Sequence, residues 1–377
     1  MKVSCLQENL ARGLSIVGRA VGARTTLPVL SNVLVATDDS RLKLSATNLE
    51  LGINCWIGAK VEQDGAITVP ARLFTELVNS LPPDRIDMEL QTRTQTLNLR
   101  CGRSEASIKG IDAQEFPIVS AGEDGRAVSI DAETLREMIA QVTLAAATDE
   151  TRPVLTGVLT AITPTGITMA AADGYRLSVR SAELTAPPEA EARVIIPARA
   201  LQELARISAD EQEPIKIIIS PSRSQAFFRL SNIDLVTQLI EGTFPDYEKI
   251  IPRSRTTRTV LNVGEFQKAV RLASLFARDS NNVVRLKVEP AGDLAPGRVI
   301  VSATSSELGS NVSELEATIE GEPIEIAFNS RFLADVLGVL DAAEVALDTN
   351  TPTSPGVLTP VGGESFLHVI MPMHLNR

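Results

Sequence analysis

The sequence predicts an α+β fold built from three tandem repeats of one unit, in which two helices pack against mostly antiparallel sheet. Three similar segments mark the repeats, and each is an apolar stretch that ends at a small residue and an arginine: Ile67–Arg72, Ile195–Arg199 and Ile326–Arg331. Apolar residues follow each arginine at two, five and six positions, the spacing of one helix face. The unit recurs about every 130 residues, far longer than a solenoid repeat, so each unit is a whole domain.

Each unit is expected to place a further helix and a strand before this marker. In the first unit Leu10, Leu14 and Val17 form the apolar stripe of that helix. The six expected helices span residues 7–21, 71–81, 132–147, 198–208, 264–278 and 329–340. Strands are expected after the first helix of each unit, over residues 29–35, 154–159 and 283–288. The predicted domains are residues 1–122, 128–252 and 256–377, joined by polar stretches near 121–127 and 253–259.

Composition places the chain among globular proteins, with 377 residues, 44% of them hydrophobic, and a net charge of −11. No apolar run follows Lys2 as in a secretory signal, and none approaches the ~20 residues that span a bilayer. The three cysteines, Cys5, Cys55 and Cys101, are far apart and odd in number. We therefore expect reduced thiols, a cytoplasmic location and no membrane contact.

Motifs for catalysis are missing from the sequence. It has no phosphate-binding glycine loop and no Gly-x-Ser-x-Gly turn, and His368 and His374 have no neighbouring ligands for a metal. No cofactor and no metal are therefore expected. The best candidate for chemistry is the segment Asp173–Leu177. It allows two interpretations: a hydrolase or transferase site with Asp173 as base and Arg176 as anion clamp, or an Asp-Gly turn between strands.

Positive charge is concentrated on the expected helices. These hold ten Lys/Arg and seven Asp/Glu, a net charge of +3, and the rest of the chain carries −14. Solvated surface charge accounts for so small an excess when it is taken alone. With three repeats that each place helices on one side, however, the same charges predict a weakly basic surface facing an acidic outer one.

Five segments spread along the chain resemble the bacterial sliding clamps, the beta subunits of DNA polymerase III: Leu27–Leu34, Thr151–Leu159, Ala171–Leu177, Gly242–Tyr247 and Val369–Leu375. The resemblance implies a DNA-clamp domain in each repeat and a head-to-tail homodimer closed into a ring, with helices inside and antiparallel sheets outside. It also implies a non-catalytic processivity factor that encircles double-stranded DNA without reading its sequence.

The same resemblance implies a pocket between the second and third domains for short linear motifs of DNA polymerase subunits, the clamp loader and repair proteins. The implied pocket residues are Leu155, Ala172, Gly174, Tyr175, Arg176, Leu177, Pro245, Lys249, Ile250, Ser354, Val369, Met371, Pro372 and Met373. An apolar cleft with adaptable methionines suits a peptide. Four residues depart from the family pattern, which puts the motif preference in doubt: Ala172, Tyr175, Lys249 and His374.

Two further sets of residues follow from the resemblance and the helix charges. Those expected to face DNA are Arg24, Arg72, Arg136, Arg152, Arg199, Arg206, Lys268 and Arg271. Those expected at the dimer interface are Ala106, Ile108, Ser274 and Leu275, of which Ala106 and Ser274 are smaller or more polar than is usual in the family. A divergent clamp copy that serves only some partners remains an alternative to the main replicative clamp.

Overall fold

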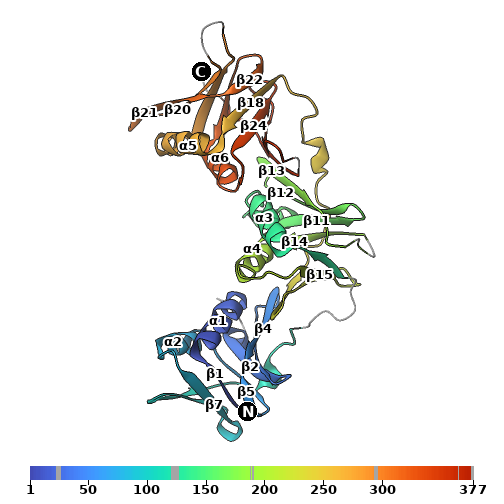
Figure 1. Cartoon of the computed structure of the whole chain (residues 1–377), viewed down its shortest axis with the longest axis vertical. Coiled ribbons are helices and arrows are strands. Elements are labelled where there is room, and N and C mark those ends of the chain that lie inside the picture. The colour runs from blue at the N-terminus through green and yellow to red at the C-terminus, as the bar shows by residue number, and fades with distance from the viewer. Residues whose placement is uncertain are drawn as a thin grey trace. The chain divides into compact units, whose positions relative to one another are not determined.

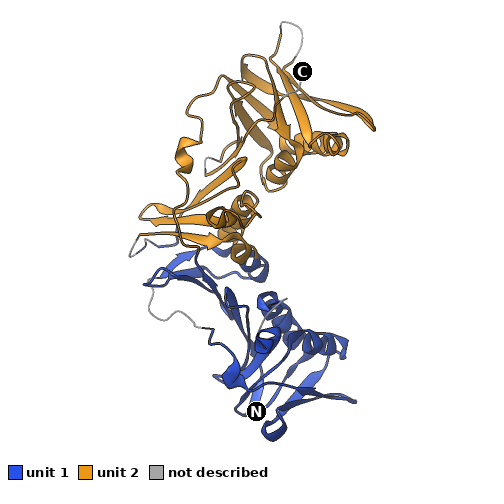
Figure 2. Ribbon diagram, turned by 180° about the vertical axis from the view of Figure 1, so that it is seen from behind, with its two compact units in different colours: residues 1–132, 184–189, 203–239 blue, residues 133–183, 190–202, 240–377 orange. Residues whose placement is uncertain are grey.

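The computed structural model describes residues 1–22, 27–119, 127–186, 188, 191–292, 296–363 and 365–374. The chain divides into two compact units (Figure 2). Unit 1 comprises residues 1–132, 184–189 and 203–239, and unit 2 comprises residues 133–183, 190–202 and 240–377. Each unit contains strands from two of the expected repeats, because neighbouring repeats share a sheet.

Unit 1 contains two antiparallel sheets (Figure 1). The five-stranded sheet runs β5 (Lys60–Gln63), β1 (Lys2–Leu6), β7 (Arg85–Gln91), β8 (Thr96–Cys101) and β9 (Ser104–Lys109). The eight-stranded sheet runs β10 (Ala127–Ile130), β15 (Ile215–Ile219), β16 (Gln225–Arg229), β17 (Ile233–Gln238), β4 (Leu51–Gly58), β3 (Arg41–Thr47), β2 (Asn32–Asp38) and β6 (Ala66–Pro70). The β17–β4 pair, with Thr237 opposite Leu51, joins two distant parts of the chain.

Two helices of unit 1 lie side by side, α1 (Gln7–Val17) and α2 (Ala71–Ser80), and α1 also packs on β4. The apolar stripe expected from the sequence is buried, since Leu10, Leu14 and Val17 are fully inaccessible to solvent. Phe74 of α2 is also fully buried. Burial of a large apolar side chain contributes about 1.5–3 kcal/mol, so these stripes hold the helices on the sheet.

Unit 2 repeats this plan. Its nine-stranded sheet runs β14 (Ala192–Pro197), β11 (Gly157–Thr163), β12 (Gly166–Ala172), β13 (Arg176–Ala182), β26 (Phe366–Ile370), β25 (Gly356–Pro360), β24 (Glu344–Thr349), β18 (Thr257–Asn262) and β22 (Thr318–Gly321). Its four-stranded sheet runs β21 (Gly309–Glu316), β20 (Arg298–Ser305), β19 (Val283–Glu289) and β23 (Ile324–Asn329). The β13–β26 pair, with Leu177 opposite Val369, makes one sheet from strands almost 200 residues apart.

Helices α5 (Val263–Ala277) and α6 (Ser330–Leu337) pack together in unit 2, and both begin at an asparagine cap. The Asn262 side chain accepts a hydrogen bond from the backbone N–H of Glu265 at 3.0 Å. The Asn329 side chain accepts one from Arg331 at 2.9 Å. These caps satisfy backbone donors that the first turn of a helix leaves without a partner. The remaining two α-helices are α3 (Ala132–Thr143) and α4 (Ala198–Ile207).

The six predicted helices are confirmed within the described part of the chain, with shorter C-terminal ends for some. Helix α3 ends at Thr143, four residues early, and α6 ends at Leu337, three residues early and just before Gly338. The strand predicted at 283–288 is confirmed as β19. The strands predicted at 29–35 and 154–159 begin too early, because Pro28–Ser31 and Pro153–Thr156 form 3-10 turns. Proline presets the backbone angle of a first helical residue and lacks the N–H that a strand needs.

The α+β prediction of repeated units with antiparallel sheets is confirmed. The predicted link near 121–127 lies outside the described residues except for Ala127. The second predicted link, 253–259, overlaps the start of β18 at Thr257. The exact domain boundaries therefore stay predictions.

Candidate functional site

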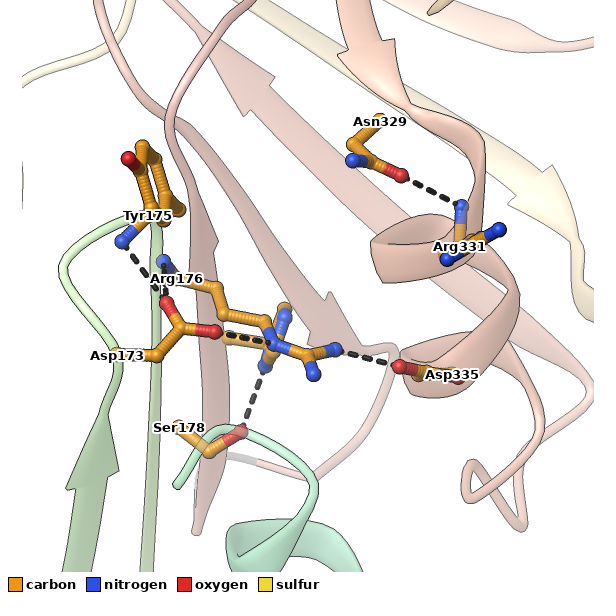
Figure 3. Close-up of polar contacts among 8 residues, drawn as sticks. Asp173, Tyr175, Arg176, Ser178, Asn329, Arg331 and Asp335 are labelled. Atoms are coloured by element: carbon orange, nitrogen blue, oxygen red, sulfur yellow. Dashed lines mark hydrogen bonds and ion pairs between the residues drawn. The ribbon is translucent and has the colours of Figure 1, made fainter. Parts of the chain in front are cut away.

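A tight turn joins β12 to β13 and carries the segment Asp173–Leu177 (Figure 3). The Asp173 carboxylate accepts hydrogen bonds from the backbone N–H groups of Tyr175 at 2.8 Å and Arg176 at 3.0 Å. Gly174 has φ +94°, a left-handed conformation that glycine adopts without steric cost. The segment is therefore a turn between strands, one of the two interpretations that the sequence allowed, and Asp173 is engaged in holding it.

Arg176 ties this turn to helix α6. Its Nε donates to Asp173 Oδ2 at 3.1 Å, and its Nη1 donates to Asp335 Oδ2 at 2.6 Å (Figure 3). Its guanidinium carbon lies 4.3 Å from the centre of the Phe332 ring, within the range of a cation–π contact. Only 12% of the Arg176 side chain is exposed. Since two carboxylates and a ring hold it, Arg176 serves as a structural bridge between β13 and α6.

A buried apolar cluster lies next to the turn, and we call it the floor cluster. Four of the predicted pocket residues belong to it: Leu155, Ala172, Leu177 and Val369. They come from four elements, and none is more than 8% exposed. Phe244 packs in the same cluster. The structure thus brings together residues that the sequence places in three distant segments.

Three large apolar side chains that are close in sequence to members of this cluster are exposed to solvent. Tyr175 is 64% exposed, Ile250 42% and Met371 39%. The backbone N–H of Met371 donates to the Tyr175 carbonyl at 2.8 Å, so these two residues are neighbours just beyond the paired ends of β13 and β26. Exposed apolar groups that gather in one place mark interaction sites more often than scattered ones do.

The other predicted pocket residues lie in three loops, which follow Phe244, β24 and β26. Pro245 and Lys249 are exposed and follow Phe244, and Lys249 forms an ion pair with Asp246 at 2.8 Å. This pair raises the pKa of Lys249 and lowers the pKa of Asp246. Pro372 and Met373 are half-buried after β26. Ser354 lies in the loop between β24 and β25, where its hydroxyl is 2.7 Å from that of Thr351.

Arg152 lies against the same turn. A Cβ atom built at Gly174 would come 3.5 Å from Arg152 Nη1, so the guanidinium covers the glycine. The sequence placed Arg152 among the residues facing DNA. The structure adds that it is an exposed cation beside Tyr175 and Gly174, which makes it a candidate contact for an anionic group of a peptide.

His368 lies on β26, and its side chain is buried. Its Nδ1 lies 2.6 Å from the hydroxyl of Ser178 on the neighbouring strand. Burial, helped by the positive charge of Arg176, lowers the pKa of His368 to about 3. The ring is therefore neutral near neutral pH. No hydrogen-bond partner for His368 Nε2 occurs among the described residues.

Phe332, Asp335 and His368 are site residues that sequence reasoning missed. Phe332 and Asp335 are three residues apart on α6, one turn of a helix, so both can reach Arg176. The repeat marker located α6, but nothing in the sequence says which helix faces the Asp173 turn. His368 was considered only as a metal ligand, although its place in an apolar strand was a signal of burial.

Comparison with known sequences covers almost the whole chain. Residues 1–120, 129–246 and 248–374 match the N-terminal, central and C-terminal domains of the DNA polymerase III beta subunit. The chain belongs to the DNA polymerase III beta subunit family. The three matches follow one another in the order N-terminal, central and C-terminal domain, at the period that the repeats predicted.

Beta sliding clamps of known sequence and structure align with the chain from end to end. The beta sliding clamp of Synechococcus elongatus is 35% identical and that of Bacillus subtilis 32% identical, over 100% and 99% of both chains. The crystal structure of the sliding clamp from Bacillus subtilis matches with a TM-score of 0.94 at 31% identity over the full length of both. That from Pseudomonas aeruginosa matches with a TM-score of 0.89 at 28% identity.

Of the basic residues predicted to face DNA, six lie on the α-helices of this beta-subunit chain, Arg152 lies in the loop before the Pro153–Thr156 turn, and Arg24 lies outside the described residues. Arg72 pairs with Glu76 at 2.8 Å and Arg206 with Glu203 at 2.6 Å. No ion pair occurs within the described ranges for the three exposed residues on α4 and α5, namely Arg199, Lys268 and Arg271. Arg136 is half-buried on α3.

The residues predicted at the dimer interface lie on an edge strand, β9, and on a helix, α5. Ala106 and Ile108 are on β9, the last strand of the five-stranded sheet, where Ile108 is 3% exposed. Ser274 and Leu275 are on α5, where Leu275 is 47% exposed. An edge strand offers unpaired backbone groups to another chain, so β9 suits an interface between subunits.

The described ranges hold no cluster of three or more His, Cys, Asp or Glu with a geometry suited to a metal ion. Of the helices in the described ranges, none combines the length and the hydropathy that crossing a bilayer requires. All three cysteines are buried and free of disulfides.

Proposed function

We propose that this beta-subunit chain is the processivity clamp of a replicative polymerase, and that the surface around Tyr175, Ile250 and Met371 binds short peptide motifs of its partners. One observation carries the proposal: exposed apolar side chains stand beside a buried apolar cluster where β13 pairs with β26. We call this place the peptide surface. The partners are DNA polymerase subunits, the clamp loader and repair proteins, and the location is the cytoplasm.

The chemistry of the peptide surface defines what it binds. Tyr175 and Met371 offer an aromatic ring and a thioether chain, which adapt to aliphatic and aromatic anchors of a peptide. Arg152 offers a cation beside the turn, whereas Lys249 is paired with Asp246 and Arg176 is held by its two carboxylates. An extended segment with apolar anchors and a polar or acidic residue fits this pattern. No bond is made or broken, so no catalytic residue is assigned.

Met371→Ala is expected to weaken binding of a polymerase or clamp-loader peptide about tenfold. The change removes most of a side chain that is 39% exposed and available for contact, and losing about 1.4 kcal/mol corresponds to a factor of ten. Fluorescence anisotropy titration of a labelled peptide measures the effect. Leu6→Ala is the matched control, since Leu6 is a 57% exposed apolar residue of the other unit. If the unchanged protein, Met371→Ala and Leu6→Ala bind the peptide with equal affinity, the binding site lies elsewhere.

For DNA we propose enclosure by a ring of two subunits joined head to tail. Exposed cations on the inner helices, such as Lys268 and Arg271, would contact phosphates weakly and without regard to sequence. An acidic protein with a net charge of −11 would otherwise be repelled by DNA, so retention has to come from topology.

Clamp loaded on a circular duplex is therefore expected to dissociate much faster once the circle is cut. Gel filtration of the protein–DNA complex, before and after cutting at one site, measures the fraction retained. The unbound protein should have about twice the 40.4 kDa mass of one chain by light scattering. Equal retention on circular and linear DNA would exclude the ring mechanism, and a cut circle with bound proteins blocking both ends serves as the control.

A further inference from the structure

The turn of the peptide surface has a close copy in unit 1, between β3 and β4. The Asn48 side-chain oxygen accepts hydrogen bonds from the backbone N–H groups of Glu50 at 3.0 Å and Leu51 at 2.8 Å. Asp173 does the same for the two residues at the equivalent places in its own turn. Leu49 has φ +77°, a left-handed conformation that is rare for leucine, where the other turn has glycine at +94°.

The strand beside this turn is also copied. The backbone N–H of Gln238 donates to the Glu50 carbonyl at 2.8 Å, as that of Met371 does to Tyr175. A third likeness is the pair Phe116–Pro117, which matches Phe244–Pro245 in sequence. Phe116 packs with Leu30 in a buried cluster, as Phe244 packs with Leu155. Unit 1 therefore contains the framework of the peptide surface, built from other side chains.

A cavity of about 170 Å³ lies at this copy, lined by the β3–β4 turn, the segment after Pro117 and strand β17. Its apolar walls include Leu49, which is 51% exposed, and Ile118, which is 94% exposed. Gly52 stands where Leu177 stands in the other surface, and a Cβ atom there would come 2.7 Å from Val119 Cγ1. Val119 thus fills part of the space. What remains is comparable to cavities that hold one small apolar group.

The charge at the rim is opposite in the two places. The peptide surface has Arg152, besides the Lys249–Asp246 ion pair, whereas the lining in unit 1 has Glu50 with the neutral amides Gln225 and Gln238. A carboxylate at the rim favours a cationic neighbour of the bound side chain and disfavours an acidic one. The amides can donate to and accept from the backbone of an extended segment.

We propose that this cavity is a second docking site, which takes one aliphatic side chain of a short extended segment of a partner protein, next to a lysine or arginine. This second site rests on the proposed function only in that its framework resembles the peptide surface. A partner with both kinds of segment would be held at two places on one clamp. Two weak contacts on one chain raise the total affinity through their high effective concentration.

Methyl NMR of the full-length clamp with labelled isoleucines tests the second site. The probes are a capped tetrapeptide of alternating lysine and leucine and its counterpart with glutamate for lysine. The lysine peptide is expected to shift the Ile118 methyl in a saturable way, with a dissociation constant on the order of 1 mM. The glutamate peptide should bind at least about fivefold more weakly, because Glu50 repels it.

Two variants that each remove one negative charge distinguish a local contact with Glu50 from attraction to the net negative charge of the whole protein. Glu50→Gln should weaken the lysine peptide about threefold or more, whereas Glu8→Gln, an exposed glutamate on α1, should leave it unchanged. An Ile118 methyl that does not move, or equal responses to both peptides, would overturn the proposal. A polymerase-derived motif peptide added to the same sample should shift the Ile250 methyl. If the Ile250 methyl does not shift, the peptide surface is refuted, whether or not the Ile118 methyl responds to the lysine peptide.

Discussion

Arg176→Ala is expected to destabilise the clamp by about 2–3 kcal/mol and to abolish tight peptide binding. The change leaves Asp173 without its side-chain donor and Asp335 without its partner at 2.6 Å, and it uncovers the Phe332 ring. Removing one member of a largely buried ion pair costs more than the pair contributes, because a desolvated charge stays behind. Asp335 is 46% exposed, so we expect a value below that of a fully buried pair.

Urea unfolding followed by circular dichroism measures this loss of stability, and peptide titration measures the loss of binding. Arg176→Met separates the two contributions to stability, since methionine can still cover Phe332 but forms no ion pair. Arg331→Ala is the control on the same helix, an exposed arginine whose loss should change stability by less than about 0.5 kcal/mol. If Arg176→Ala unfolds at the same urea concentration as the unchanged protein, the bridge to α6 is not stabilising.

Acid is expected to destabilise the clamp through His368, by about 2 kcal/mol at pH 5. The pKa of His368 is about 3 in the folded chain, below the 6.5 of an exposed histidine. Between these two pKa values His368 is protonated in the unfolded chain but not in the folded chain, so the free energy of unfolding falls as pH falls below 6.5. Each pH unit in this window costs about 1.4 kcal/mol.

His368→Asn removes the titrating ring, and its side-chain oxygen can take the place of Nδ1 beside Ser178. The difference in unfolding free energy between the two proteins, measured from pH 7.5 to 4.5, isolates this histidine from the carboxylates that also titrate. The unchanged protein should lose about 2 kcal/mol more than His368→Asn between pH 7 and pH 5. Parallel curves for the two proteins would mean that His368 is protonated as easily when folded as when unfolded.

The repeat could be found from sequence because its signals are local. The apolar stripe after Arg72 recurs after Arg199 and Arg331, and helix periodicity needs only neighbouring residues. The helix ends were less predictable. Helix α6 ends just before Gly338, although the apolar pattern continues through Val339 and Leu340. The 3-10 turns at Pro28 and Pro153 were missed because short apolar runs fit a strand as well as a turn.

The candidate site was predictable only where a family pattern supplied it. Leu155 and Val369, both predicted to line the pocket, lie in one buried apolar cluster, although no local signal in the sequence connects them. The bridge from Arg176 to Asp335 joins residues 159 positions apart, and such a contact depends on tertiary structure alone. The segment Ala46–Leu49 recurs in sequence as Ala171–Gly174, but only the structure shows that Leu49 adopts the left-handed conformation of Gly174.

The strand pairs β17–β4 and β13–β26 have a consequence for any attempt to study the repeats one at a time. A fragment ending near residue 252 would keep β13 but lose β26, leaving the backbone of Arg176–Ala182 without the neighbour it has in the whole chain. Bare strand edges recruit other chains, so such a fragment is prone to aggregate. The half of the peptide surface contributed by Met371 would be missing as well, which makes the intact polypeptide the smallest piece worth assaying.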